Sequence, residues 1–549
     1  MSTCISDISH ATFESAPAPR EVFMSAIRPL LRLALCATVS ACAAAPASSS
    51  VALPGTAMRS APASPNDPPP QLGAIIEADL TRDLYALGGD NFRGREGGTL
   101  DEMRASGWLA DRMREAGLEP AGEDGTFFQW IPMRRYRQSD ESRITIGGTA
   151  VKLFAEAAVI APVDASIDAE LVFVEPDAVI DPALIRGKAV ATVLVPAATT
   201  AATTNAGIPG RPRQLNGANA VRQAATRFLQ AGAVAVVVAS DSAAESAFTR
   251  SGDAMVRGRY GVDTANATAY WPDPTSGTRR PQSPAILWVR RGLLGLLRTP
   301  NQRLKAHLST ENFQYPSVNL VGRVRGTDAR LRDEYVLYSG HQDHDGVRTA
   351  IEGDSIWNGA DDNASGSVAI LAVARAFAKQ PGRRSVLFVW HGSEERGLIG
   401  SRYHVMHPMV PKNQIVAVLN GEMVGRNNPD SMTILGAIPP HRNSETLVSI
   451  ARRANDEVSR FKLDTLWDLT SHPQGWYFRS DHLPYARAGI PSIEFSSNLH
   501  ADYHTPRDEP SRIDYIKLTR VAKWMYATGW TVANADQRPP LDPNFKLER

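Results

Sequence analysis

The segment that decides the fold spans residues 385–395 and reads SVLFVWHGSEE. Its first six residues are mostly β-branched, aromatic or aliphatic, and such side chains favour a strand. A short continuous apolar run of this kind is typical of a strand that is buried on both faces of a sheet. Two adjacent acids, Glu394 and Glu395, follow the run. The segment therefore predicts a buried strand whose carboxyl end carries two carboxylates.

Three further apolar runs are each followed by a residue that can bind a metal ion. They are VLY at 336–338 before His341, IVAVL at 415–419 before Glu422, and IPSIEF at 490–495 ahead of His504. Any one of these polar residues, taken alone, is more often a surface or capping residue than a ligand. In open α/β sheets, however, ligands bind beyond the carboxyl ends of the strands. Four such strand ends predict a mixed α/β fold, with a central sheet flanked by helices and a site at one edge.

The candidate site contains imidazoles and carboxylates but no thiol. Asp343 lies two residues after His341, and Asp361 lies in the loop NGADDNASG at 358–366. Nitrogen and oxygen ligands of this kind suit zinc, although manganese or cobalt can bind the same atoms. Two neighbouring ions also need a carboxylate that bridges them. We therefore expect a hydrolase site that holds two Zn²⁺ ions.

These motifs resemble those of the co-catalytic zinc aminopeptidases of metallopeptidase family 28. The motifs HxD (341–343), GADDNASG (359–366), SEExGLxGS (393–401) and YHTPxD (503–508) follow one another in the order found in that family. The likeness covers most of the chain after about residue 75. It implies a zinc aminopeptidase-like fold and an inserted protease-associated domain, mainly β, in which short β-runs such as AVAVVVAS (233–240) lie.

The resemblance also assigns the metal ligands. It implies that Asp361 bridges the two ions, with a cis bond between Asp361 and Asp362. One zinc would then be held by His341, Asp361 and Glu422, and the other by Asp361, Glu395 and His504. Many family members have Asp where this chain has Glu422, but a glutamate can also reach a zinc ion. Without Glu422 the site would hold a single metal, as in glutaminyl cyclases, and the presence of His341 and Asp343 argues against that.

The same resemblance assigns three residues to the chemistry. Glu394 is expected to be the general base, Asp343 to orient the ring of His341, and Tyr503 to donate a hydrogen bond to the oxyanion. We interpret the remaining histidines near the motifs as hydrogen-bonding or surface residues; they are His344, His391, His404, His407, His472, His482 and His500. Asp481 is expected to support the fold around the site.

The amino terminus predicts export. From Met24, which we expect to be the true start, a basic segment with Arg28 and Arg32 precedes an apolar run that is too short to span a bilayer. The residues before Cys42 read VSA, which resembles a bacterial lipobox, so Cys42 is expected to carry a lipid anchor in the outer membrane. The alternative is an ordinary signal peptide that is cleaved nearby. The three cysteines, Cys4, Cys36 and Cys42, all lie in this leader.

Length and composition set the domain organisation. The chain has 549 residues, 59 Lys plus Arg and 58 Asp plus Glu, so its net charge of +1 gives no indication of nucleic acid binding. A chain of this length exceeds one core, which predicts a main domain and an insertion. We expect a signal peptide (1–42), a flexible linker (43–72), a zinc peptidase domain (73–135 and 311–535), an insertion (136–310) and a disordered tail (536–549).

Together these features predict an exported, periplasmic aminopeptidase that acts on peptides. The first alternative is a carboxypeptidase or dipeptidase, which needs an arginine to hold the substrate carboxylate, and Arg426 and Arg487 lie near the motifs. The second is a non-catalytic receptor-like module, as the transferrin receptor is in the family that this chain resembles. Such a module is expected to lack ligands or the base, and this chain has residues of the right type at every position.

Overall fold

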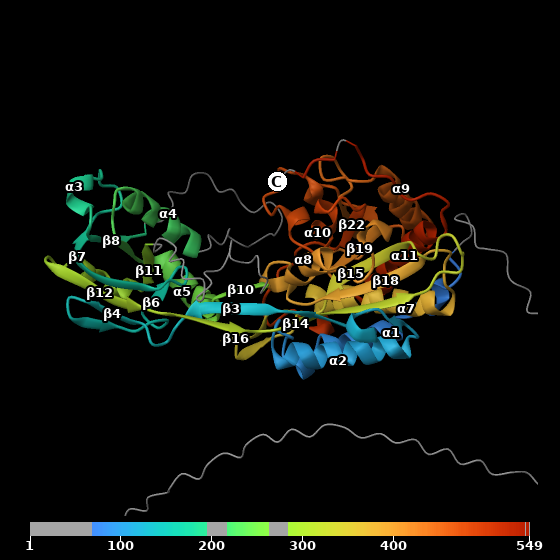
Figure 1. The fold of residues 1–549 in the computed structure, drawn as a ribbon, viewed down its shortest axis with the longest axis horizontal. Coiled ribbons are helices and arrows are strands. Elements are labelled where there is room, and N and C mark those ends of the chain that lie inside the picture. The colour runs from blue at the N-terminus through green and yellow to red at the C-terminus, as the bar shows by residue number, and fades with distance from the viewer. Residues whose placement is uncertain (1–68, 195–216, 263–283, 544, 548–549) are drawn as a thin grey trace, which may run out of the picture. The chain divides into compact units, whose positions relative to one another are not determined.

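The computed structural model of the protein describes residues 69–194, 217–262, 284–543 and 545–547 (Figure 1). The predicted signal peptide and most of the predicted linker lie outside these residues. Within the described part of the chain, no helix is both long and apolar enough to cross a membrane.

The main sheet has nine strands and contains the four strands that the sequence predicts. Its strands are β1 (Glu119–Pro120), β2 (Phe128–Ile131), β14 (Ser317–Val324), β15 (Tyr335–His341), β18 (Ser385–His391), β19 (Ile415–Glu422), β20 (Ser431–Leu435), β21 (Lys462–Leu463) and β22 (Ser492–Ser496). The central strands β18, β15, β19 and β22 are parallel neighbours in that order. Antiparallel strands β14 and β20 flank them. The mixed α/β fold is thus confirmed, and the carboxyl ends of the four parallel strands share one edge.

Both faces of this sheet are buried, which explains the continuous apolar runs in the sequence. Side chains alternate between the two faces of a strand. In β18, Val386, Phe388 and Trp390 enter one hydrophobic core, whereas Leu387 and Val389 enter another. The sheet therefore separates two cores that are built from alternate residues of the same strands.

Helices cover the two faces unequally. The larger core is covered by α1 (Glu77–Leu87), α2 (Leu100–Glu115), α7 (Gly366–Lys379), α9 (Glu445–Ala454) and α11 (Tyr515–Asn534). The smaller core packs against α8 (Ile399–Met406) and α10 (His482–Arg487). Helix α7 approaches the sheet closely at its first residue, because a Cβ atom on Gly366 would lie only 2.3 Å from the carbonyl oxygen of Gly421. The close approach brings the loop before α7 to the carboxyl edge of the sheet.

The region of the predicted insertion has its own eight-stranded sheet. The strands are β4 (Arg143–Ile146), β5 (Thr149–Val151), β6 (Ala157–Val159), β7 (Ala165–Phe173), β8 (Ala189–Val193), β9 (Ala235–Ala239), β11 (Ala285–Val289) and β12 (Gln302–Leu308). Four helices accompany them: α3 (Pro182–Ile185), α4 (Gly217–Gln230), α5 (Ser242–Arg257) and α6 (Leu294–Arg298). Helices are about as extensive as strands, so the region is mixed α/β rather than mainly β. Its identification as a protease-associated domain stays a prediction.

The chain leaves and re-enters the main domain through a small three-stranded sheet. Strand β3 (Met133–Gln138) pairs with β10 (Arg259–Val262) on one side and with β13 (Thr310–Gln314) on the other. The expected boundaries at 135/136 and 310/311 fall inside this sheet, because a strand continues through each of them. A two-stranded hairpin, β16 (Gly346–Ile351) and β17 (Asp354–Trp357), follows β15 in the main domain.

The tail after α11 differs from the expected disorder. Arg538 donates to Glu334 Oε1 (2.9 Å) and to the carbonyl of Asn413, and the backbone N–H of Asp542 donates to the carbonyl of Asn443. Leu547 packs against a buried cluster. The proline-rich composition suggested a free end, but these long-range polar contacts fix much of the tail to the main domain.

Candidate metal centre

The carboxyl edge of the main sheet gathers the predicted polar residues. His341 and Glu422 are the last residues of β15 and β19, and Glu394 and Glu395 lie in a tight turn three residues after β18. His504 lies in the loop that follows β22. The parallel pairing of β18, β15, β19 and β22 brings these residues to the same edge of the sheet. The loop before α7 reaches this edge separately.

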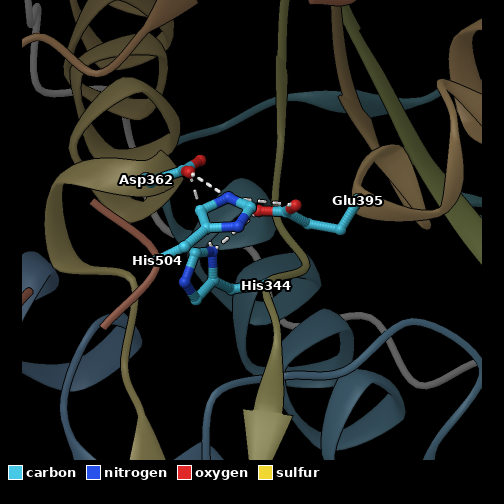
Figure 2. A group of neighbouring side chains, drawn as sticks. All are labelled: His344, Asp362, Glu395 and His504. Carbon is cyan, nitrogen blue, oxygen red and sulfur yellow. Dashed lines mark hydrogen bonds and ion pairs between the residues drawn. The ribbon is translucent and has the colours of Figure 1, made fainter. Parts of the chain in front are cut away.

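Two groups of side chains at this edge could each hold a metal ion. One consists of His341, Asp362 and Glu422, and the other of His344, Asp362, Glu395 and His504. Figure 2 shows the second group, in which the imidazoles meet the carboxylates of Asp362 and Glu395. Asp362 is common to both groups, so it is the residue that could bridge two ions.

The distances within the groups fit ligands around zinc. Zinc–ligand bonds of about 2.0–2.1 Å in a tetrahedral site place neighbouring ligand atoms about 3.3 Å apart. His341 Nε2 lies 3.3 Å from Asp362 Oδ1 and 3.4 Å from Glu422 Oε1. His504 Nε2 lies 3.1 Å from Asp362 Oδ2 and 3.3 Å from Glu395 Oε2. The two oxygens of Asp362 thus face different groups, as a bridging carboxylate requires.

The structure places Asp361 outside both groups, in contrast to the expected ligand set. Its Oδ1 accepts a hydrogen bond from the backbone of Gly425 (2.6 Å), and its Oδ2 lies 3.4 Å from His500 Nε2. The cis peptide bond joins Asp362 and Asn363, one residue later than expected. The loop turns between the two aspartates, so adjacent side chains point in different directions. Two consecutive identical residues in a sequence cannot show which of them faces the site.

Backbone and side-chain acceptors fix the orientation of the two ligand histidines. His341 Nδ1 lies 3.0 Å from the carbonyl oxygen of Asp343. A carbonyl can only accept, so Nδ1 carries the proton and Nε2 has a free lone pair. His504 Nδ1 lies 3.2 Å from Asp345 Oδ2, which leaves its Nε2 directed at Asp362 and Glu395. Asp345 in turn accepts from Arg348 (2.7 Å). Nothing in the sequence identified Asp345.

The side chain of Asp343 accepts hydrogen bonds from the turn that carries Glu394 and Glu395, rather than from His341. Its Oδ1 accepts from the backbone N–H of Glu394 (2.9 Å), and its Oδ2 accepts from that of Glu395 (3.4 Å). The Oδ1 atom is 3.7 Å from His341 Nδ1, which already donates to the main chain. Asp343 therefore holds the two glutamates in place at the end of β18.

Burial and charge set the protonation of the three glutamates differently. Burial raises the pKa of Glu394 well above its usual range, because the charged form loses water and has other carboxylates nearby. Burial likewise raises the pKa of Glu422 to about 7. For Glu395, the attraction of His504 and His344 outweighs burial and holds the pKa well below its usual range. Glu394 thus combines a raised proton affinity with a position 3.8 Å from His341 Nε2.

Two further contacts hold Glu422. Ser480 Oγ donates to its Oε2 at 2.6 Å, and Asn363 Nδ2 donates to the same atom at 3.1 Å. The other oxygen, Oε1, faces His341. The extra methylene of glutamate is therefore accommodated by donors that fix one oxygen and direct the other toward the metal group.

Tyr503 lies beside the second group and contacts an arginine that the sequence interpretation missed. Arg479 Nη2 donates to Tyr503 Oη (2.9 Å), and the ring of Tyr503 stacks on that of His504 with centroids 3.9 Å apart. Arg426, by contrast, is paired with Asp502 (2.7 Å), and Arg487 is exposed. Arg479 therefore contacts a residue beside the second group, and only its position before the SDH segment could have suggested it.

The residues present suit zinc on an independent ground. Glu395 Oε1 and both ring nitrogens of His344 are buried without a hydrogen-bond partner. Buried polar atoms nearly always have a hydrogen-bond partner, so these three atoms need a binding partner. A cation bound by nitrogen and oxygen atoms supplies one. His344, which the sequence interpretation treated as a hydrogen-bonding or surface residue, is completely buried in this group.

Comparisons with known proteins concern the same part of the chain. A family model described as Peptidase family M28 matches residues 319–529. A probable zinc metalloprotease from Leptosphaeria maculans is 28% identical over 256 residues, which cover 40% of this chain and 58% of that protein. Aminopeptidase YwaD from Bacillus subtilis is 27% identical over 188 residues, which cover 33% of this chain and 39% of that protein. The chain thus spans about half the length of these curated relatives.

A solved structure extends the likeness in fold to most of the chain. The aminopeptidase from Aneurinibacillus sp. strain AM-1 superposes with a TM-score of 0.52 at 18% sequence identity, covering 86% of this chain and 97% of that one. At this identity the likeness concerns the fold alone. The family match at 319–529 contains the four central strands and every member of both metal groups. Residues 319–529 of this chain are therefore similar to Peptidase family M28.

Proposed function

We propose that the protein is an exported two-zinc aminopeptidase that removes amino-terminal residues from peptides. The observation that carries the proposal is the position of Asp362, whose Oδ1 faces His341 and whose Oδ2 faces His504. A single-metal site has no need of a shared carboxylate with a separate imidazole on each oxygen. The match of residues 319–529 to Peptidase family M28 and a relative named as an aminopeptidase support the reaction class.

In this proposal His341, Asp362 and Glu422 hold one zinc, and Asp362, Glu395 and His504 hold the other. Zinc at such a site acts as a Lewis acid on a carbonyl and increases the acidity of water. The protein supplies the remaining steps. Asp343 fixes the turn of Glu394 and Glu395 through their backbone N–H groups, so that one glutamate binds metal while the other faces the substrate.

Glu394 is the proposed general base. Its carboxylate takes the proton of the attacking water and then delivers it to the leaving amine. A base works best when its pKa lies near the working pH, and burial raises the pKa of Glu394 in that direction. Positioned general bases contribute roughly 10²–10⁴-fold to rate.

Tyr503 is the proposed oxyanion donor, and Arg479 positions it. The guanidinium donates to the phenol oxygen, so the phenolic hydrogen is free to point elsewhere. A hydrogen bond from that O–H to the developing oxyanion would stabilise the transition state. Arg479 lies over the ring of Trp476 (4.8 Å to its centroid), which restricts the guanidinium.

A carboxypeptidase or dipeptidase remains the second candidate, on one observation. Arg479 is a largely buried cation beside the site, and arginine is suited to bind a substrate carboxylate. We favour the aminopeptidase because Arg479 already donates to Tyr503. Because this chain has residues of the right type at all five proposed ligand positions and at the base, a receptor-like module has less support.

The test is hydrolysis of amino-acid anilides and of amino-blocked peptides by the wild type and by Glu394→Gln at equal zinc content. The proposal expects cleavage of the free-amine substrates, with a rate lower by roughly 10²–10⁴-fold in Glu394→Gln. Glu352→Gln, the same change at an exposed residue, is the control and should retain activity. Cleavage of blocked peptides alone would identify a carboxypeptidase, and zinc binding without any cleavage would favour the receptor-like module.

The proposal also includes export and a lipid anchor at Cys42. It rests on the basic, then apolar, leader and the VSAC sequence at 39–42, which lie outside the described residues. The test is cell fractionation with intact mass measurement of the mature chain. A lipidated Cys42 should keep the protein in the membrane fraction, and Cys42→Ala should release it or block its maturation. A soluble wild-type protein would indicate an ordinary signal peptide.

A further inference from the structure

His344 is an imidazole that the proposed pair of zinc sites does not require. The residue lies three positions after the end of β15 and is completely buried. Neither of its ring nitrogens has a hydrogen-bond partner. Burying an imidazole whose two nitrogens have no hydrogen-bond partner costs free energy of folding, so a binding partner for these nitrogens is expected.

The ring faces the group formed by Asp362, Glu395 and His504. His344 Nδ1 lies 2.9 Å from Glu395 Oε1 and 4.0 Å from Asp362 Oδ2. The rings of His344 and His504 are perpendicular, with centroids 5.3 Å apart. Figure 2 shows the four side chains converging from separate segments of the chain. The distances of 2.9 and 4.0 Å lie on either side of the separation of about 3.3 Å expected for two ligands of one zinc ion.

The contact between His344 and Glu395 has two explanations, a direct hydrogen bond and an ion bound to both residues. The two atoms lie 2.9 Å apart, yet neither Nδ1 nor Glu395 Oε1 has a hydrogen-bond partner. A cation bound to both atoms would account for their close approach. The geometry therefore favours a shared ion over a direct contact.

The imidazole ring of His344 packs closely against the backbone of Gly359, where a side chain would not fit. Gly359 has a positive φ of 59°, and a Cβ atom there would lie 2.3 Å from Cγ of His344. Arg95 donates to the carbonyl of Gly359 (3.0 Å) and to that of Gln342 (2.7 Å). Its own carbonyl accepts from the backbone N–H of His344 (3.2 Å). Both sides of the ring are thus fixed by backbone contacts.

We infer that His344 Nδ1 is an additional ligand of the zinc ion held by Asp362, Glu395 and His504. The inference rests on the proposed two-zinc function and gives the two sites different coordination. One site has four protein ligands and the other, with His341, Asp362 and Glu422, has three. Four protein ligands are typical of closed zinc sites, and three leave a position open. The His344 site should therefore bind zinc more tightly and fill first.

The experiment counts imidazoles around the metal in the full-length protein. One equivalent of Co²⁺ is added to metal-free wild type, and X-ray absorption measures the ligands of the tight site. The inference expects two imidazoles on this ion, from His344 and His504. A single imidazole would overturn it. This measurement needs no variant, so it does not depend on whether a substituted protein folds.

A variant then separates ligation from a role as hydrogen-bond donor. Asn in His344→Asn can still donate to Glu395 but is a poor zinc ligand. The tight-site affinity, measured by competition with a chelator, should fall by about 100-fold or more, because even changes around a ligand cost 10- to 100-fold. The visible spectrum of the Co²⁺ form should change as well. The control is His407→Asn, because His407 is exposed and directly follows α8. This variant should keep the tight-site affinity and the Co²⁺ spectrum of the wild type.

The outcomes distinguish this inference from the proposed function. His344→Asn could keep metal affinities within about threefold of those of the wild type and an unchanged Co²⁺ spectrum. This result would overturn the ligand assignment and leave two zinc ions in place. A wild type that binds a single ion with two imidazoles would refute the two-zinc proposal but support His344 as a ligand. Thermal midpoints of the metal-free proteins verify that the variant is folded.

Discussion

Replacing the adjacent aspartates with asparagine, one at a time, tests which of them joins the two proposed metal sites. Asp362→Asn replaces a carboxylate whose oxygens lie 3.3 Å from His341 Nε2 and 3.1 Å from His504 Nε2. Asp361→Asn is the matched control, one residue away with the same loss of charge. Its Oδ1 accepts from the backbone of Gly425, and an amide oxygen can do the same.

The expected magnitudes follow from what each side chain touches. Changes around a ligand cost about 10- to 100-fold in metal affinity, so loss of the ligand itself should cost at least about 100-fold. Asp362→Asn loses that ligand from both sites, which is about 2.8 kcal/mol or more for each ion. Asp361→Asn should weaken zinc binding by less than about 10-fold. Its effect should appear instead as a loss of stability of about 1 kcal/mol, because a buried hydrogen bond to a charged acceptor becomes one to a neutral acceptor.

The assay combines zinc content after dialysis, affinity by chelator competition and the thermal midpoint of the metal-free protein. The reasoning expects no retained zinc in Asp362→Asn and two zinc ions in Asp361→Asn. It would be refuted by the reverse pattern, in which Asp361→Asn loses both ions and Asp362→Asn keeps them. Loss of only one ion in Asp362→Asn would contradict a shared bridge.

Three further predictions concern neighbouring groups. Asp345→Asn should weaken one zinc ion by about 10- to 100-fold and leave the other unchanged, because Asp345 contacts only His504 among the ligands, and chelator competition measures both affinities. Tyr503→Phe should lower kcat by about 100-fold or more with little change in KM or zinc content, and an unchanged kcat in steady-state assays would exclude the oxyanion role. Relative to Glu422→Gln, the metal-free wild type should lose stability as the pH rises from 5 to 8, since burial raises the pKa of Glu422 to about 7, and the stability from this shift is complete only below the ordinary pKa of about 4.5. Thermal midpoints of the two chelator-treated proteins check this trend, and a difference between them that stays constant with pH would contradict it.

The central sheet was predictable because burial on both faces leaves a strong signal. Strands β15, β18, β19 and β22 are buried along their whole length, and their runs of apolar residues are unmistakable in the sequence. Parallel pairing then brings their ends together without further information. The positions of His341, Glu394, Glu395 and Glu422 follow from this rule alone.

The loops were less predictable because a side chain's direction there depends on the local backbone. In the loop before α7, the turn exposes Asp362 to the site and directs Asp361 toward Gly425. After β15, the chain directs both His341 and His344 into the site, although they are three residues apart. No periodicity of a regular helix or strand applies to either segment. Asp345 and Arg479 were missed for the same reason, since each acts on a ligand or on Tyr503 through a tertiary contact.

Arg95 shows that the site also depends on a segment far from the matched residues 319–529. Its guanidinium is completely buried and donates to the carbonyls of Leu87, Gln342, Asn358 and Gly359. Burial lowers the pKa of Arg95 to about 10, so the group stays charged at neutral pH, where it faces a cluster of acids. Each hydrogen bond from a charged donor typically contributes about 1.5–3 kcal/mol. The guanidinium of Arg95 therefore links the loop of His344 to the loop of Asp362. The separation between these two loops depends on a residue near the amino terminus that is not among the proposed metal ligands.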